Sequence, residues 1–396
     1  MKRRDFLRYS LAGGAVLAQP QLVFATTETY SFYNPTRYIF ITDRESPFIT
    51  VFNVFYGKYV GSLNFDMKPE VIELSRDDSM MVVGNTESTE LILYDLQTRM
   101  QRVLTLPSPI HRAFFIPQSK LVAIAMREHL GMVNYESGEL LVYPEPYDVA
   151  NRDSANGQHF QLLFSSFTRT YWVLDGDSPR IYRKSAYDPE DTSWEAMDFS
   201  ERLGTSLGFE DGLVTPGNYL MALTAKQGNE GYAYFIEEDK LLSTGPMGAK
   251  GETGASMLRP YIDSSFKRVL FADTGGNIAL FNFDKSEEAE HYKVDFSPQH
   301  FRTGWLESTL IIAGDKGLQF QSFDDLDDKK VFELPSGVVD TWVSGDGKIL
   351  YLTLEEGEPQ VLRYDIRRRE PLEPILVHGV MSAGALRMGS SNSICF

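Results

Sequence analysis

The chain repeats a unit of four short apolar segments, separated by polar turns, at a period of about 40–50 residues. In one unit the apolar segments are residues 69–74, 80–85, 91–95 and 102–106, and residues 76–79 form the first polar turn. A period in this range indicates a repeat architecture, in which all units belong to one continuous array. The repeat therefore predicts a single domain, although the 396 residues would by length alone suggest two or three.

The apolar segments have the length and spacing of β-strands, and no stretch shows a long helical stripe. The predicted second strands of the units are residues 38–42, 80–84, 121–125, 170–174, 219–224, 268–272, 309–313 and 349–354. Four-stranded units of this length close into a β-propeller, because radial repetition leaves only short edges unpaired. We therefore predict an all-β, closed propeller of four-stranded antiparallel blades.

The ends of the chain decide how the ring closes. The first unit lacks its first strand, and residues 380–388 are left over after the eighth unit. We expect this C-terminal segment to supply the missing inner strand of the first blade. The count is then eight blades, with seven as the alternative if the first unit packs differently.

The N-terminus has the features of an export signal. Lys2-Arg3-Arg4-Asp5-Phe6-Leu7-Arg8 precedes an apolar stretch, and Val23-Phe24-Ala25 offers small residues at a cleavage site. This segment resembles a twin-arginine signal peptide, with an ordinary secretory signal as the alternative. The resemblance implies a signal at residues 1–25, a mature propeller at residues 26–396 and a periplasmic location.

Composition excludes several classes of function. The net charge is −17, so we expect no nucleic-acid partner. No later stretch is apolar for about 18 residues, so we expect no membrane span. The single cysteine, Cys395, excludes an intramolecular disulfide and a cysteine-based metal site.

Histidines mark the points where an outer strand leads to the next inner strand. In a propeller these points share one face, at the mouth of the central channel, and imidazole suits a metal, a haem-like cofactor or an anionic ligand. Four histidines lie there, and His129 is expected on the same face, whereas His291 is expected elsewhere. The four candidates are His111, His159, His300 and His378, of which His111, His159 and His300 are the candidate metal ligands.

Three arginines add to this candidate site. Arg112, Arg259 and Arg302 are predicted on adjacent inner strands, where guanidinium groups would bind a carboxylate or phosphate. The alternative is that each histidine packs within its own blade, since blades three and seven lie across the channel and would separate His111 from His300.

Polar residues follow the second strands on the same face. They form an all-oxygen cation site in one interpretation and ordinary loop caps in the other. These residues are Asp43, Arg44, Asn85, Asp175, Asp177, Asp273 and Asp315.

The units resemble the YVTN-type repeat family of bacterial propellers. Residues 338–354, which read Val-Val-Asp-Thr-Trp-Val-Ser-Gly-Asp-Gly-Lys-Ile-Leu-Tyr-Leu-Thr-Leu, carry the resemblance best. More broadly, the chain is similar to the propeller subunits of periplasmic amine dehydrogenases. That resemblance implies a propeller that supports a catalytic partner.

Two functions are consistent with these sequence features. In the first, which we favour, the chain is a non-catalytic periplasmic binding or scaffold protein with a protein partner, such as the propeller subunit of a redox complex. In the second, the histidine-bearing channel mouth binds a metal or a tetrapyrrole and serves a lactonase-like hydrolase or a cofactor-handling protein. No catalytic motif decides between them, so enzymatic activity is uncertain and no cofactor is required by the sequence.

Overall fold

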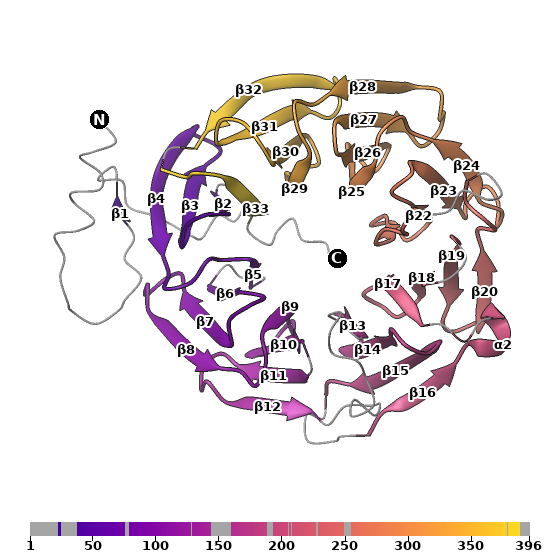
Figure 1. The fold of residues 1–396 in the computed structure, drawn as a ribbon, viewed down its shortest axis with the longest axis horizontal. Helices are drawn as coiled ribbons and strands as arrows, with labels where there is room; N and C mark the ends of the chain where they lie inside the picture. Colours follow the sequence, from indigo (N-terminus) through magenta and orange to yellow (C-terminus); the bar gives the residue numbers. More distant parts are fainter. Residues whose placement is uncertain are drawn as a thin grey trace.

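The chain forms eight antiparallel sheets arranged as blades around a central axis (Figure 1). The computed structural model describes residues 23–24, 38–75, 79–127, 129–143, 160–187, 193–204, 206, 208–226, 229–248, 255–377 and 379–388. The predicted all-β propeller of eight blades is confirmed, and the alternative of seven is wrong.

Each blade has four strands that run from the axis outward. The innermost strands of blades one to eight are β33 (Ala383–Met388), β5 (Val71–Leu74), β9 (Ile110–Phe115), β13 (Phe160–Ser165), β17 (Phe209–Val214), β21 (Tyr261–Ile262), β25 (Pro298–Gly304) and β29 (Val338–Val343). The second strands are β2 (Tyr38–Asp43), β6 (Met80–Gly84), β10 (Leu121–Met126), β14 (Thr170–Asp175), β18 (Leu220–Ala225), β22 (Arg268–Ala272), β26 (Thr309–Gly314) and β30 (Ile349–Leu354).

The two outer strands of each blade complete the sheets. The third strands are β3 (Phe48–Asn53), β7 (Glu90–Asp95), β11 (Leu130–Asn134), β15 (Arg180–Ser185), β19 (Gly231–Phe235), β23 (Asn277–Asn282), β27 (Gly317–Ser322) and β31 (Gln360–Asp365). The outermost strands are β4 (Lys58–Asn64), β8 (Gln101–Thr105), β12 (Leu140–Tyr143), β16 (Glu195–Asp198), β20 (Lys240–Ser243), β24 (Glu290–Lys293), β28 (Lys329–Glu333) and β32 (Glu370–Leu376). A short helix, α2 (Ser200–Leu203), follows β16.

Burial explains why the second and third strands read as continuous apolar runs. Every residue of β18 and of β23 is buried, because both faces of each sheet pack against a neighbouring blade. The outermost strand β28 is largely exposed and carries Lys329 and Lys330. Charges on such an edge also discourage pairing with a further strand.

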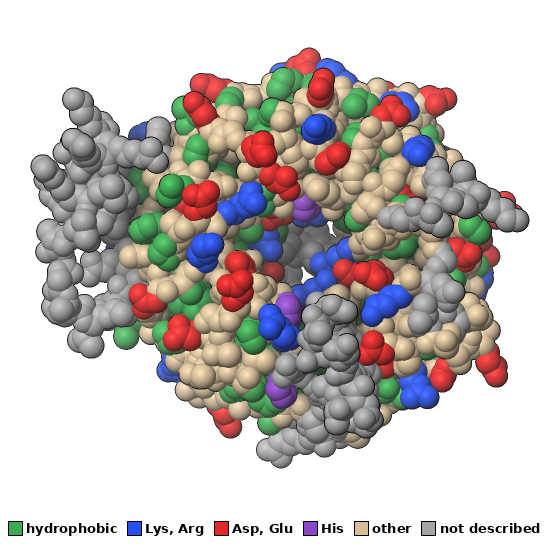
Figure 2. Space-filling view, viewed as in Figure 1, with side chains coloured by type: hydrophobic (Ala, Val, Ile, Leu, Met, Phe, Trp, Pro, Cys, Tyr) green, Lys and Arg blue, Asp and Glu red, His purple; other side chains and the backbone are tan. Residues whose placement is uncertain are grey.

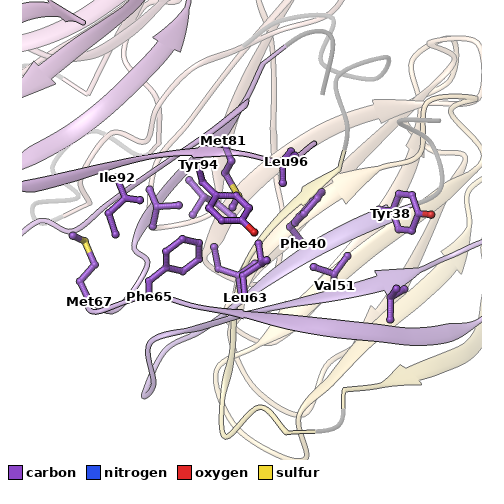
Figure 3. Packing of buried hydrophobic residues seen from close by; sticks show 14 residues of the cluster. Tyr38, Phe40, Val51, Leu63, Phe65, Met67, Met81, Ile92, Tyr94 and Leu96 are labelled. Carbon is purple, nitrogen blue, oxygen red and sulfur yellow. The ribbon is translucent and has the colours of Figure 1, made fainter. Parts of the chain in front are cut away.

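Apolar side chains fill the space between each pair of neighbouring blades. Between blades one and two, Phe40 and Phe65 meet Met81 and Tyr94 (Figure 3). The rings of Phe65 and Tyr94 lie edge to face, with centroids 5.8 Å apart. The core is thus a ring of equal parts rather than one central core, which leaves the axis free for polar groups.

The C-terminal strand closes the ring as predicted. β33 pairs with β2, so that Met388 lies opposite Ile39 and Ala383 lies opposite Asp43. The buried Asp43 carboxylate accepts hydrogen bonds from the backbone amides of Met381 (2.9 Å) and Ser382 (3.1 Å). The two ends of the repeat are therefore joined both by a strand ladder and by a buried cap.

A fifth strand extends blade one at its outer edge. This strand, β1 (Val23–Phe24), pairs antiparallel with β4, with Val23 opposite Ser62. These two residues lie within the segment predicted as a signal peptide. No helix in the described part of the chain is long and apolar enough to cross a membrane.

β-Bulges recur near the start of the innermost strands. The register shifts within β9, β17, β25 and β29, in each case just before a polar residue, and it also shifts between β2 and β33. A bulge bends the strand and re-aims the side chain that follows it. The bulges thus decide which residues of the inner strands lie toward the axis.

Candidate ligand site in the central channel

Charged side chains gather around the axis of the propeller. Figure 2 shows Lys, Arg, Asp and Glu side chains around a central opening. Within the described ranges, the innermost strands and the segment before β21 supply seven charged residues that influence one another, which we call the channel ring. The channel ring consists of Glu73, Arg112, Asp211, Arg259, Arg302, Asp340 and Arg387.

Strand register places these residues at two levels along the axis. At one level, Arg112 lies opposite Ala125 and Asp340 lies opposite Thr353, each directly after a bulge. The second level lies two residues farther along an inner strand. At this level, Arg302 on β25 lies opposite Ile311. Side chains two residues apart share a face of a strand, so both levels line the same channel.

Asp340 is the hydrogen-bond acceptor that connects the channel ring between blades eight and two. Its carboxylate accepts hydrogen bonds from the backbone amides of Thr341 and Leu386 and from Nη1 of Arg387, the last at 2.9 Å. Arg387 also donates from Nε to the carbonyl oxygen of Ile72 in blade two. The Asp340 carboxylate therefore has partners for both of its oxygens.

A second ion pair spans three blades. Nη2 of Arg112 in blade three donates to both carboxylate oxygens of Asp211 in blade five, at 3.2 and 3.4 Å. Nη1 of Arg112 reaches the carbonyl oxygen of Leu162, on the inner strand of blade four, at 3.5 Å. This bridge neutralises both charges within the channel wall.

Arg302 is held by backbone carbonyl groups rather than by a close carboxylate. It donates from Nη1 to Phe301 and from Nη2 to Thr341, both at 2.8 Å. Its distance to Asp340 is 3.8 Å, between Nη2 and Oδ1. The guanidinium is thus fixed in position.

Arg259 differs from the other arginines of the channel ring. No described residue accepts a hydrogen bond from it or forms an ion pair with it, and its side chain is exposed to solvent. The surrounding protein nevertheless displaces much of the water around the guanidinium. This desolvation, together with the positive charge of Arg112, lowers the pKa of Arg259 to about 10. A protonated guanidinium with five unused donors is a site for an anion.

Glu73 is the acidic counterpart of Arg259. Its closest basic group is Arg387, whose Nε lies 3.8 Å from Oε1, and no hydrogen bond to its carboxylate comes from the residues that the structure describes. Burial raises the pKa of Glu73, and the charges of Arg387 and Arg259 oppose that rise. Asp211 and Asp340 are saturated, so Glu73 is the channel carboxylate with free acceptors.

The structure separates the predicted histidines that it describes. His111 lies on β9 in blade three and His300 on β25 in blade seven, on opposite sides of the ring. His159 and His378 lie outside the described residues. Over the ranges described, no group of three or more His, Cys, Asp or Glu side chains is placed to hold a metal.

The individual histidines have distinct surroundings. His129 shares a hydrogen bond of 3.3 Å with Ser108, which places it on the predicted face, at the mouth of the channel. His291 lies elsewhere, on outer strand β24, where its Nε2 contacts the carbonyl oxygen of Thr244. Burial and the charges of Arg127 and Arg112 lower the pKa of His111, and its Nε2 is buried without a hydrogen-bond partner. A neutral imidazole is therefore favoured there.

The prediction of three arginines on adjacent inner strands is partly wrong. Arg259 and Arg302 belong to neighbouring blades six and seven, but Arg112 lies three blades away, in blade three. Arg112 nevertheless reaches the same channel because it extends across blade four to Asp211. For these three arginines the sequence indicated the channel but not how far apart they lie around it.

The polar residues after the second strands mostly cap their own loops. Asp175 accepts hydrogen bonds from the amide of Asp177 and the hydroxyl of Ser178, and Asn85 accepts from the amides of Glu87 and Ser88. Asp273 accepts from the amides of Gly275 and Asn277. These contacts agree with the interpretation as loop caps.

Sequence reasoning missed four members of the channel ring, Glu73, Asp211, Asp340 and Arg387. Each is a charged residue on an inner strand that otherwise carries mostly apolar or small residues. The sequence signal that could have found them is a charged residue among the apolar residues of a predicted first strand.

Comparison with known proteins shows likeness of fold alone. No family model matches the chain, and no curated protein matches its sequence. Among solved structures, the dihydro-heme d1 dehydrogenase NirN in complex with DHE has a TM-score of 0.69 at 10% identity, covering 95% of this chain and 78% of that one. A functionally unknown protein from Desulfotomaculum acetoxidans has a TM-score of 0.55 at 10% identity, covering 89% and 99%.

Proposed function

We propose that this protein is a non-catalytic binding protein that holds a carboxylate-bearing small ligand in its central channel. The observation that carries the proposal is the free guanidinium of Arg259, exposed in a channel where the other arginines of the ring are already bonded. Pairing an exposed cation with an anion inside a confined channel restores the interactions that it lost on folding.

The electrostatics of the channel support binding near neutral pH. A pKa of about 10 keeps Arg259 protonated at neutral pH, so its charge is available to a carboxylate. Hydrogen bonds to charged groups contribute about 1.5–3 kcal/mol each, more than neutral ones do. Arg302 adds positive charge near Arg259, although its own hydrogen bonds are occupied.

The substitution Arg259→Gln tests the proposal. It removes the charge and retains a polar side chain, and we expect carboxylate ligands to bind about tenfold or more weakly, equivalent to about 1.4 kcal/mol. Titration calorimetry with caproate and absorbance titration with haem would measure this. The matched control is Arg183→Gln, which removes an arginine from β15 that pairs with Glu195 away from the channel. Equal affinities for the variant and the wild type, or no carboxylate binding at all, would contradict the proposal.

A tetrapyrrole is the second candidate ligand, favoured by the likeness to NirN, which was solved with DHE. The described residues offer Arg259 to the anionic edge of such a molecule, whereas His111 and His300 lie on opposite sides of the ring and do not bring two imidazoles together. If haem binds far more tightly than caproate and Arg259→Gln weakens both, the tetrapyrrole class is favoured.

The predicted export signal, periplasmic location and protein partner accompany this proposal. A binding protein exported in the folded state would arrive with its channel already formed. The YVTN-type resemblance and the similarity to amine dehydrogenase subunits stay predictions.

A further inference from the structure

The channel ring contains one cation and one anion without hydrogen bonds to any described residue. Arg112, Arg302 and Arg387 donate to protein acceptors, and Asp211 and Asp340 accept from protein donors. The other two members, Arg259 and Glu73, have free donors and free acceptors.

These two residues lie on opposite sides of the axis. Glu73 is on β5 in blade two, and Arg259 precedes β21 in blade six, so three blades lie between them in either direction around the ring of eight. The two charges still attract each other electrostatically, because each residue favours the charged form of the other. The effect crosses the channel, since the wall between them is occupied by other ion pairs.

We propose that Arg259 and Glu73 form a two-point clamp for a zwitterion, a molecule that carries a carboxylate at one end and an ammonium group at the other. The carboxylate would accept hydrogen bonds from Arg259, and the ammonium group would donate to Glu73. This inference rests on the proposed function and deepens it by adding a second recognised group. It is a binding step, and no covalent bond changes.

The charge balance favours this ligand over a simple anion. An anion alone at Arg259 would leave the Glu73 carboxylate facing it across a confined channel, and like charges repel in such surroundings. A zwitterion satisfies both groups without adding net charge. An amino acid with its two charges at opposite ends therefore fits better than an anion of equal length.

The experiment uses ligands that differ in length and in charge. Calorimetry on the full-length protein would compare glycine, β-alanine, γ-aminobutyrate, δ-aminovalerate and ε-aminocaproate with the single-charge probes caproate and hexylammonium. We expect one length of amino acid to bind at least about tenfold more tightly than caproate. The preferred length measures the distance between the two poles.

Three variants assign the two ends. Glu73→Gln should weaken the preferred amino acid about tenfold and leave caproate unchanged or improved, whereas Arg259→Gln should weaken both. Glu73→Asp keeps the charge but withdraws the carboxylate by one methylene, so the preferred ligand should become one methylene longer. A purely structural role for Glu73 would not change the preferred length. Thermal unfolding would confirm that each variant is folded.

The outcomes separate this inference from the proposed function. If caproate binds as tightly as every amino acid, the clamp is wrong and the anion site stands. If Glu73→Gln strengthens caproate binding but no amino acid is preferred, the two residues pair with each other and the clamp is again wrong. If no carboxylate binds to the wild type, the proposed function fails as well.

Discussion

At the scale of single residues, burial controls the charge state of the channel histidines. Burial lowers the pKa of His300, the Asp340 carboxylate partly offsets this, and Arg302 adds to it. The folded protein therefore binds a proton at His300 less readily than the unfolded chain, whose histidine pKa is about 6.5. The stability that the neutral imidazole contributes is present above that value and is lost as the pH falls below it.

The substitution His300→Gln tests this pH dependence. We expect the wild type to lose more free energy of unfolding than the variant when the pH falls from about 7.5 to about 5, because the wild type must charge one more partly buried imidazole than the variant. Urea unfolding at a series of pH values measures both curves. Gln299→Asn, on the same strand without a titrating group, controls for disturbance of β25. Parallel curves for His300→Gln and the wild type would refute the assignment.

At the scale of elements, close contact between blades depends on small residues at particular positions. Gly231, on β19 of blade five, faces the ring of Phe271 on β22 of blade six, and a Cβ added there would overlap that ring. A Cβ at Gly217, in the turn before β18, would meet nothing nearby. Of these two glycines in blade five, Gly217 therefore has room for a larger side chain and Gly231 does not.

The pair Gly231→Ala and Gly217→Ala tests this packing. Overpacking a filled interface costs about 1–3 kcal/mol, so Gly231→Ala should lower the free energy of unfolding by about that amount. Gly217→Ala should leave it within about 0.5 kcal/mol of the wild type. Urea unfolding measures both. Two variants of equal stability would mean that blades five and six are less closely packed than the structure indicates.

At the scale of the whole molecule, closure of the ring depends on contacts between residues far apart in the chain. Asp43 caps the segment before β33, whereas the equally buried Asp175 caps its own loop, through Asp177 and Ser178. Removing either carboxylate leaves partly buried backbone amides without their acceptor, and each such hydrogen bond contributes about 0.5–1.5 kcal/mol. Only the loss of Asp43 also weakens the junction between blade one and blade eight.

Limited proteolysis of Asp43→Ala and Asp175→Ala tests the closure. We expect Asp43→Ala to become sensitive to cleavage at residues 379–382, between β32 and β33, because β33 detaches more often. Asp175→Ala should not gain cleavage there, even if its overall stability falls by a similar amount. Mass spectrometry of the fragments identifies the sites. Identical fragments from both variants would show that Asp43 acts only as a local cap.

Much of the fold was accessible from the sequence because each unit carries its own pattern. The predicted second strands agree with β2, β6, β10, β14, β18, β22, β26 and β30 to within one residue at each end. Alternation of apolar runs and turns is a local property, and one blade's strands are neighbours in the chain. The missing first strand and the spare segment at residues 380–388 then determined closure by counting.

The site depended on information that the sequence does not contain. Whether an inner-strand side chain lies toward the axis depends on the phase of the strand, and bulges in β9, β17, β25 and β29 shift that phase by one residue. The bridge from Arg112 to Asp211 joins residues 99 positions apart and passes over a whole blade. The sequence alone predicted a closed propeller and favoured eight blades over seven, because local patterning and chain length carry that information; the structure decided for eight. Only the tertiary structure decided that Arg259 and Glu73 lack hydrogen-bond partners among the described residues, because which charges pair around the axis depends on angular position and reach.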